Sequence, residues 1–314
     1  MEYLTSGITS AFDMYIYPKE VIQACVDCGF RIVQVSGLNN FTSSLEELEE
    51  QYVTYNDYHE LCSYKLGFHA EYTTDKKLLE GLAGLSEKYH APVYTHNSET
   101  KREVEECRQR YGKSPTQLFE AMGLYRYGGG GYHCIWFDDE DIDIFAKRQL
   151  SVVTNPASNL KLASGIAPLK KMQEAGINLA IGTDGPASNN CLDMFREMFL
   201  VTGLAKLREH DAAVMDANDV LYMATTGGAK AMGLSDCDCL AVGKKADLIL
   251  MNLMQPNMQP EHNLTKNLVY SGSKQNVKLT MVNGKILYED GQFFISEEPQ
   301  EIYKKANEIV SRMK

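Results

Sequence analysis

A histidine and a glutamate in the middle of the chain have the types and spacing of a hydrolytic site. His96 ends a short apolar run and is followed by Asn, Ser and Glu99. A neutral imidazole is a good ligand for zinc or iron. Residues three apart share a helix face, so Glu99 can move protons beside that imidazole. A helix cap formed by Ser98 and Glu99 next to a buried His96 explains the same residues without a function.

A second acidic residue follows another apolar run. Asp184 stands in the segment Ile-Gly-Thr-Asp-Gly-Pro-Ala-Ser, where glycine and proline predict a turn. A carboxylate there can bind a metal and accept a proton from an attacking water. Capping of the next helix is an equally good reason for an aspartate at this place.

Two more histidines close apolar runs. His133 follows four glycines and a tyrosine, and His69 stands in Gly-Phe-His-Ala-Glu. His133 can polarise a water or a leaving group, and His69 can contact a substrate. Buried, hydrogen-bonded histidines are the alternative in both cases. The segment 155–161 brings amides and a lysine to another strand end, where a turn held by asparagine side chains is the alternative. We treat the remaining histidines as surface residues: His59, His90, His210 and His262.

Apolar runs alternate with amphipathic stretches over the first two thirds of the chain. The predicted strands are Ile8–Phe12, Arg31–Val35, Leu66–Ala70, Pro92–His96, Gly130–Ile135, Leu150–Thr154 and Asn178–Thr183. The predicted helices are Lys19–Asp27, Leu45–Leu61, Lys76–Tyr89, Lys101–Tyr111, Pro115–Met122, Glu140–Lys147 and Leu169–Glu174. This alternation predicts a parallel α/β sheet.

The polar residues decide between an open sheet and a barrel. Five of them fall at the carboxyl ends of predicted strands: His69, His96, His133, Asn155 and Asp184. An open sheet gathers ligand groups near one switch point, whereas a (β/α)8 TIM-type barrel collects them from many strand ends at one rim. We therefore predict a barrel over residues 1–235.

The composition changes after the barrel. Short β-rich runs at 246–252, 277–282 and 285–288, with the hairpin signal Asn283-Gly284, predict a partial β-sandwich appendage over residues 236–295. A helix closes the chain within residues 296–314.

The net charge of −11 argues against nucleic acid or an anionic membrane as partner. No apolar run has the length of a membrane span, and no signal peptide precedes the first strand. We expect a cytoplasmic protein with reduced thiols, the Cys25-x-x-Cys28 pair included, that binds a small molecule.

Four segments taken together, in this order, resemble one branch of a known superfamily. They are His-Asn-Ser-Glu-Thr-Lys from 96, Gly-Gly-Gly-Gly-Tyr-His-Cys from 128, Asn-Pro-Ala-Ser-Asn-Leu-Lys from 155 and Gly-Thr-Asp-Gly-Pro-Ala-Ser from 182. The chain resembles the methylthioadenosine/S-adenosylhomocysteine deaminases of the amidohydrolase superfamily over nearly its whole length. Triazine chlorohydrolases and guanine deaminase are related branches. The resemblance implies a metal-dependent hydrolase that deaminates adenosine-like purines.

The resemblance also implies a role for each residue that matches the motifs. His96 and Asp184 would bind a divalent metal, zinc or iron, and Asp184 would also shuttle protons. Glu99 would be the general acid/base that protonates the purine ring, and His133 would help to activate the water. The residues expected to contact substrate are His69, Glu99 and Ser188.

Two departures from the family pattern limit these expectations. The family's first barrel strand ends in His-x-His, which this sequence lacks, so the resemblance implies that the first strand and two metal ligands are missing. We then expect metal to be held weakly or not at all, and the unpaired strands to make a homo-oligomer. Ser36 stands where many relatives have an arginine that would bind the carboxylate of S-adenosylhomocysteine. The alternatives are an amidohydrolase for another heterocycle, of the guanine deaminase or chlorohydrolase type, and a catalytically inactive fragment or binding protein.

Overall fold

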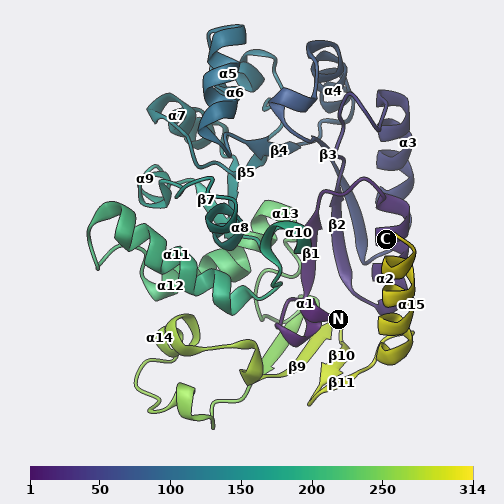
Figure 1. Cartoon of the computed structure of the whole chain (residues 1–314), viewed down its shortest axis with the longest axis vertical. Coiled ribbons are helices and arrows are strands. Elements are labelled where there is room, and N and C mark those ends of the chain that lie inside the picture. The colour runs from purple at the N-terminus through teal and green to yellow at the C-terminus, as the bar shows by residue number, and fades with distance from the viewer. Residues whose placement is uncertain (314) are drawn as a thin grey trace.

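The larger part of the molecule is a parallel sheet of seven strands with helices packed around it (Figure 1). The computed structural model describes residues 1–313. The strands lie side by side in chain order: β1 (Ser10–Asp13), β2 (Arg31–Val35), β3 (Cys62–Phe68), β4 (Val93–Asn97), β5 (Gly129–His133), β6 (Ser151–Thr154) and β7 (Asn178–Ile181). Within the described residues β1 and β7 each pair with only one strand. All seven predicted strands are confirmed, with bounds that shift by a few residues.

Helices connect successive strands, as a parallel sheet requires. Around the sheet lie α2 (Pro18–Cys28), α3 (Leu45–Asn56), α4 (Lys76–Tyr89), α5 (Lys101–Tyr111), α6 (Pro115–Ala121), α7 (Asp139–Arg148), α8 (Pro156–Lys161), α9 (Leu169–Glu174), α10 (Pro186–Asn189), α11 (Met194–Glu209), α12 (Ala217–Tyr222) and α13 (Gly228–Met232). Side-chain caps start several of them; Asp75, for example, accepts a hydrogen bond from the Leu78 amide at 3.0 Å. The predicted helix 45–61 ends at Asn56, because the chain turns there into β3.

The strands bury one face against the helices and the other inside the curled sheet. Along β4, Val93 packs in the large core shared with the helices, whereas Tyr94 packs in a smaller inner cluster with Tyr132 and Val153. Side chains two residues apart in a strand point to the same face. His96 therefore shares the inner face with Tyr94 and lies above it, near the carboxyl end of β4.

The segment 155–161 forms the short helix α8. From the sequence, two interpretations of this segment were open: amides and a lysine at a strand end, and a turn held by asparagine side chains. Pro156 occupies the first helical position, where its fixed φ and missing N–H are tolerated. The asparagine pattern is thus part of a strand-to-helix junction, and it brings Ser158 and Asn159 to the strand ends.

A second, antiparallel sheet packs beside the first near the N-terminus (Figure 1). Its order is β11 (Gln292–Phe293), β10 (Lys285–Glu289), β9 (Val277–Val282) and β8 (Leu248–Met251). The hairpin predicted at Asn283-Gly284 joins β9 to β10, and these two turn residues have positive φ angles. The strand β11 was not predicted. Three helices complete the chain: α1 (Glu2–Thr5), α14 (Leu264–Lys266) and α15 (Pro299–Arg312).

Residues far apart in sequence fasten the two sheets to each other. Arg31 on β2 donates two hydrogen bonds to Asp247, at 2.5 and 2.9 Å, across 216 positions of the chain. Both side chains are almost fully buried. The hydroxyl of Thr280 donates to the carbonyl of Leu4 at 2.7 Å, a contact that spans 276 positions. The N-terminal turn is thus part of the interface between the sheets.

Two expectations about composition can be compared with the described residues. Within residues 1–313, no helix combines the length and the apolar character needed to cross a bilayer. All eight cysteines are free, Cys25 and Cys28 included, as expected for reduced thiols.

Candidate active site

Three histidines form a row at the carboxyl end of the parallel sheet. The ring centroids of His69 and His96 are 5.0 Å apart, and those of His96 and His133 are 5.5 Å apart. Nδ1 of His96 lies 2.8 Å from the carbonyl oxygen of His69. A carbonyl only accepts, so this nitrogen carries the proton and donates it. Nε2 of His96 is left with a free lone pair, the form that binds metals.

Two histidines of the row, His69 and His96, have lowered pKa values. Burial, followed by the neighbouring imidazoles of His133 and His69, lowers the pKa of His96 to about 3. Burial also lowers the pKa of His69, although the carboxylate of Glu99 opposes that shift. Both rings are therefore neutral at physiological pH, which keeps their lone pairs available.

His133 is held in a defined orientation by an amide. Its Nδ1 lies 2.7 Å from Oδ1 of Asn159, in a buried contact. Since that oxygen accepts, Nδ1 carries a proton and donates it, and Nε2 is the nitrogen on the other side of the ring. This Nε2 lies 3.9 Å from Oε2 of Glu99. His133 and Glu99 thus face the same space.

Glu99 is fixed by hydrogen bonds to its side chain and to its backbone. The hydroxyl of Ser164 donates to its Oε1 at 3.1 Å. Beneath it, the buried carboxylate of Glu103 accepts the backbone amides of Ser98, Glu99 and Thr100 at 3.0, 2.8 and 3.4 Å. The cap of α5 is Thr100, which forms a capping box with Glu103, so a cap made by Ser98 and Glu99 is excluded. The side chain of Glu99 is free for another role.

Asp184 lies three residues beyond β7 and is oriented by its neighbours. Its Oδ2 accepts from the Ser158 hydroxyl at 2.5 Å, and its Oδ1 accepts from the Gly185 amide at 2.6 Å. The cap of α10 is Gly185, so Asp184 is not the helix cap considered from the sequence. Its negative charge raises the pKa of His96, against the larger effect of burial. Ser188 lies on α10, and within residues 1–313 its side chain makes no hydrogen bond to these groups.

The backbone is strained where these side chains emerge. Positive φ angles occur at Ser98 (51°), His133 (67°), Cys134 (52°) and Asp184 (57°). Left-handed conformations are uncommon for residues other than glycine and cost about 1–3 kcal/mol each. Such strain concentrates at functional sites, and here it lies at the ends of β4, β5 and β7.

The structure brings five of the six predicted site residues together at one rim. His69, His96, His133 and Glu99 are linked by the distances above, and Asp184 lies at the same end of the parallel sheet. The four histidines treated as surface residues are exposed: His59, His90, His210 and His262.

Sequence reasoning missed two supporting residues, Glu103 and Ser164. The pattern Thr100-x-x-Glu103 is a readable capping-box signal, whereas no sequence signal marks Ser164.

The donor set fits a divalent metal only in part. His96 Nε2 and the Asp184 carboxylate are ligands of the right chemistry. A catalytic zinc needs three protein ligands, yet among residues 1–313 no three His, Cys, Asp or Glu side chains are placed so that they could hold one metal ion together. The described residues therefore do not complete a metal site.

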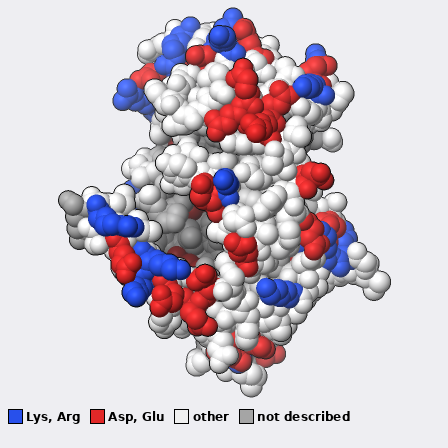
Figure 2. All heavy atoms as spheres, turned by 90° about the vertical axis from the view of Figure 1, so that its right-hand side faces the viewer, with Lys and Arg blue, Asp and Glu red and all other residues white. Residues whose placement is uncertain are grey.

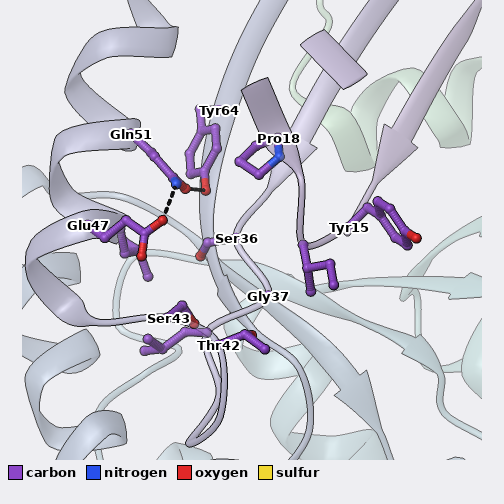
Figure 3. A pocket seen from close by; sticks show the side chains of 12 residues that line it. Tyr15, Pro18, Ser36, Gly37, Thr42, Ser43, Glu47, Gln51 and Tyr64 are labelled. Carbon is purple, nitrogen blue, oxygen red and sulfur yellow. Dashed lines mark hydrogen bonds between the residues drawn. The ribbon is translucent and has the colours of Figure 1, made fainter. Parts of the chain in front are cut away.

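A pocket lies at the carboxyl end of β2 (Figure 3), and no histidine of the row lines it. The backbone connects the two places, since the carbonyl of Leu38, one of the pocket walls, accepts the amide of His69 at 2.9 Å. Figure 3 shows Ser36 beside Glu47 and Gln51. The residues that line the pocket include one carboxylate, that of Glu47, and no lysine or arginine. They are Tyr15, Ile16, Pro18, Ser36, Gly37, Leu38, Thr42, Ser43, Glu47, Leu48, Gln51 and Tyr64.

The chain is similar to several known proteins over nearly its whole length. The chain is 35% identical over 323 residues to 5-methylthioadenosine/S-adenosylhomocysteine deaminase of Thermoanaerobacter pseudethanolicus, covering 99% of the chain and 75% of that protein. It is 36% identical to 5'-deoxyadenosine deaminase of Methanothermobacter thermautotrophicus, covering 95% and 71%. The crystal structure of an adenosine deaminase from Xanthomonas campestris with bound zinc superposes with a TM-score of 0.91 at 32% identity, covering 98% and 72%.

The predicted TIM-type barrel fold is confirmed, since the solved relative superposes over nearly all of the chain. Residues 1–287 match the amidohydrolase family, a range that contains every residue of the rim. With this match, and with relatives above 30% identity of which it covers more than two thirds, the chain belongs to the amidohydrolase family.

Proposed function

We propose that this protein is a hydrolytic deaminase of adenosine-like purines. The observation that carries the proposal is the arrangement of Glu99 and His133. Oε2 of Glu99 and Nε2 of His133 lie 3.9 Å apart on strand ends that also present His96. Three relatives at 35–36% identity named as deaminases of methylthioadenosine, S-adenosylhomocysteine or 5'-deoxyadenosine support the same reaction.

In the proposed reaction, water adds to the ring carbon that bears the amine, and ammonia leaves. Glu99 gives a proton to the adjacent ring nitrogen, which makes that carbon more electrophilic. His133 Nε2 or the Asp184 carboxylate accepts one proton of the attacking water and passes it to the amine, and the second proton of the water goes from the new hydroxyl to Glu99, which restores the acid. Ammonia departs as the carbon–nitrogen bond breaks, and the ring keeps the oxygen as a carbonyl. His69 and Ser188 are proposed to contact the substrate.

We propose that the cofactor is a divalent metal, zinc before iron, with His96 and Asp184 as two of its ligands. Support comes from the neutral His96 with its free Nε2, and from the zinc named in the solved Xanthomonas relative. Such a metal supplies Lewis-acid activation of the attacking water. Because the described residues offer only these two ligands, we expect loose binding.

The pocket beside Ser36 suggests which substrates are preferred. The Ser36 hydroxyl is used by the backbone of Gly67, donating at 2.6 Å and accepting at 2.8 Å, so it is not free for a ligand. The pocket walls come in part from α2 and α3, and Figure 2 shows acidic side chains gathered on that side of the molecule. A substrate carboxylate would meet Glu47 and no cation. We therefore propose purines with an uncharged arm, such as 5'-deoxyadenosine or methylthioadenosine, over S-adenosylhomocysteine.

Ammonia release with each candidate substrate tests the proposal. The purified chain, supplied with excess zinc, is incubated with adenosine, 5'-deoxyadenosine, methylthioadenosine and S-adenosylhomocysteine. We expect turnover of the uncharged nucleosides, with kcat/KM lower by roughly 10-fold or more for S-adenosylhomocysteine, the value of one missing charge-assisted contact. Guanine and a chlorotriazine test the alternative reactions. Turnover of either one without any nucleoside deamination would overturn the proposal, and no turnover at all would favour the binding protein.

We also propose a homo-oligomer, supported by the unpaired edges of β1 and β7, since such edges favour association with another chain. Light scattering after size exclusion would give the mass, and a monomer would contradict this. The eight free cysteines support a reducing compartment such as the cytoplasm.

A further inference from the structure

A buried carboxylate on α11 lies behind the rim and touches none of the groups discussed above. Glu197 is completely buried, with 0% exposure, on a helix that packs against α8. Figure 1 shows α8, α10 and α11 next to one another. A buried carboxylate is costly unless every oxygen is hydrogen-bonded. Its partners therefore indicate why an acid is needed at this position.

The two carboxylate oxygens of Glu197 bind two different segments of the rim. Oε2 accepts the backbone amide of Ala157, at the start of α8, at 2.9 Å. Oε1 accepts Nδ2 of Asn189, on α10, at 2.8 Å. The same Nδ2 donates to the carbonyl of Thr183, the residue before Asp184, at 2.7 Å. One side chain thus joins the segment after β6 to the segment after β7.

Both segments also meet at Asp184 itself. Ser158, next to Ala157, donates its hydroxyl to Oδ2 of Asp184 at 2.5 Å. Asp184 holds a strained left-handed backbone, with φ of 57°, and strained residues persist only where their surroundings over-determine them. The bonds through Glu197 fix the residues on either side of this contact.

The bonding pattern specifies a carboxylate over an amide. Both partners of Glu197 are N–H donors, so the side chain must accept twice and donate nowhere. A glutamine would turn an NH2 group toward one of them. Asn189 cannot adapt by rotating its amide, because its oxygen would then face the carbonyl of Thr183. Burial raises the pKa of Glu197 to about 7, while the Ala157 and Asn189 donors lower it.

We propose that Glu197 is a positioning residue that aligns the carboxylate of Asp184 by tying α8 to α10. It acts through Ala157, Asn189 and Thr183 and touches neither substrate nor metal. The proposal rests on the role proposed above for Asp184. Outer residues that orient a metal ligand typically change metal affinity or activity by 10–100-fold when they are replaced.

The test compares Glu197→Gln with a matched buried acid elsewhere. Asp141 is also 0% exposed; in the capping box of α7 it accepts from the Asp138 amide at 3.1 Å, and its side chain makes no hydrogen bond to α8 or α10. Asp141→Asn should lose stability without changing the rim. Two measurements are made on each full-length variant: hydrogen exchange of the peptides covering 155–161 and 183–190, and zinc affinity by competition with a chromophoric chelator.

For Glu197→Gln we expect faster exchange in both peptides together, and zinc affinity lower by roughly 10–100-fold. Asp141→Asn should leave both unchanged. Unchanged exchange at 183–190 in Glu197→Gln overturns the proposal, as does an equal effect of Asp141→Asn. If wild-type zinc binding is too weak to measure, the exchange result decides alone. Asp184→Asn separates the two ideas: if it leaves zinc affinity and turnover unaltered, the proposed role of Asp184 fails, whatever Glu197→Gln does to exchange.

Discussion

Replacing Glu103 by glutamine should change the pH dependence of stability in a predictable direction. Two effects oppose each other at this buried side chain: loss of water disfavours the charge, and three backbone amides favour it. Burial is the larger effect and raises the pKa of Glu103 to about 7 from its ordinary 4.5. The folded protein therefore binds this proton more tightly than the unfolded chain.

The sign and size follow from that difference. Between pH 4.5 and 7 the folded state holds more protons, so the wild type loses stability as pH rises through this window. The shift from 4.5 to about 7 corresponds to roughly 3 kcal/mol. Glu103→Gln removes this titration and one or two hydrogen bonds, about 1 kcal/mol each. We expect the variant to be less stable by about 1–2 kcal/mol at pH 4.5 and more stable by about as much at pH 8.

Urea unfolding followed by circular dichroism at pH 4.5, 6, 7 and 8 measures the free energy of unfolding of both proteins and shows whether the difference between them changes sign. Glu105→Gln, an exposed position on the same helix, is the control and should differ little from wild type at every pH. A deficit of Glu103→Gln that stays constant or grows with pH would refute the reasoning. The three backbone amides would then outweigh burial and hold the carboxylate ionised.

Three further outcomes are expected. Glu99→Gln should lower kcat by roughly 10²–10⁴-fold and leave zinc content unchanged; near-normal deamination would remove Glu99 from its role. Asn159→Leu should release the buried ring of His133 and lower kcat more than KM changes, with the ring tautomer followed by ¹⁵N NMR; an unaltered tautomer and kcat would contradict this. Arg31→Met should leave Asp247 as an unpaired buried charge and cost about 3–5 kcal/mol of unfolding free energy; a loss below 1 kcal/mol would show that water reaches the pair.

The strands and the rim could be predicted from the sequence because both depend on local signals. Each strand is a short apolar run, and His69, His96 and Asp184 stand at or just beyond the ends of such runs. Parallel pairing then brings these ends to one side of the sheet. The polar residues occur at the carboxyl ends of the strands, and this indicates which end of the parallel sheet carries the candidate site.

The contacts that hold the rim in place could not be predicted. Glu197 occupies an ordinary position in a helical pattern, where an acid normally faces water, and only the packing of α11 against α8 buries it. Ser164 reaches Glu99 across 65 positions of sequence. The asparagines of the segment 155–161 favour a turn locally, so the helix α8 could not be predicted from them.

The fastening of the N-terminal turn to the last sheet has a consequence for biosynthesis. Thr280 must be made before it can bind the carbonyl of Leu4, and Asp247 before it can pair with Arg31. At roughly 5–20 residues per second, translation of the intervening 276 positions takes about 14–55 s. Contacts so distant in sequence form slowly. During synthesis Arg31 therefore remains without its buried partner until Asp247 has left the ribosome.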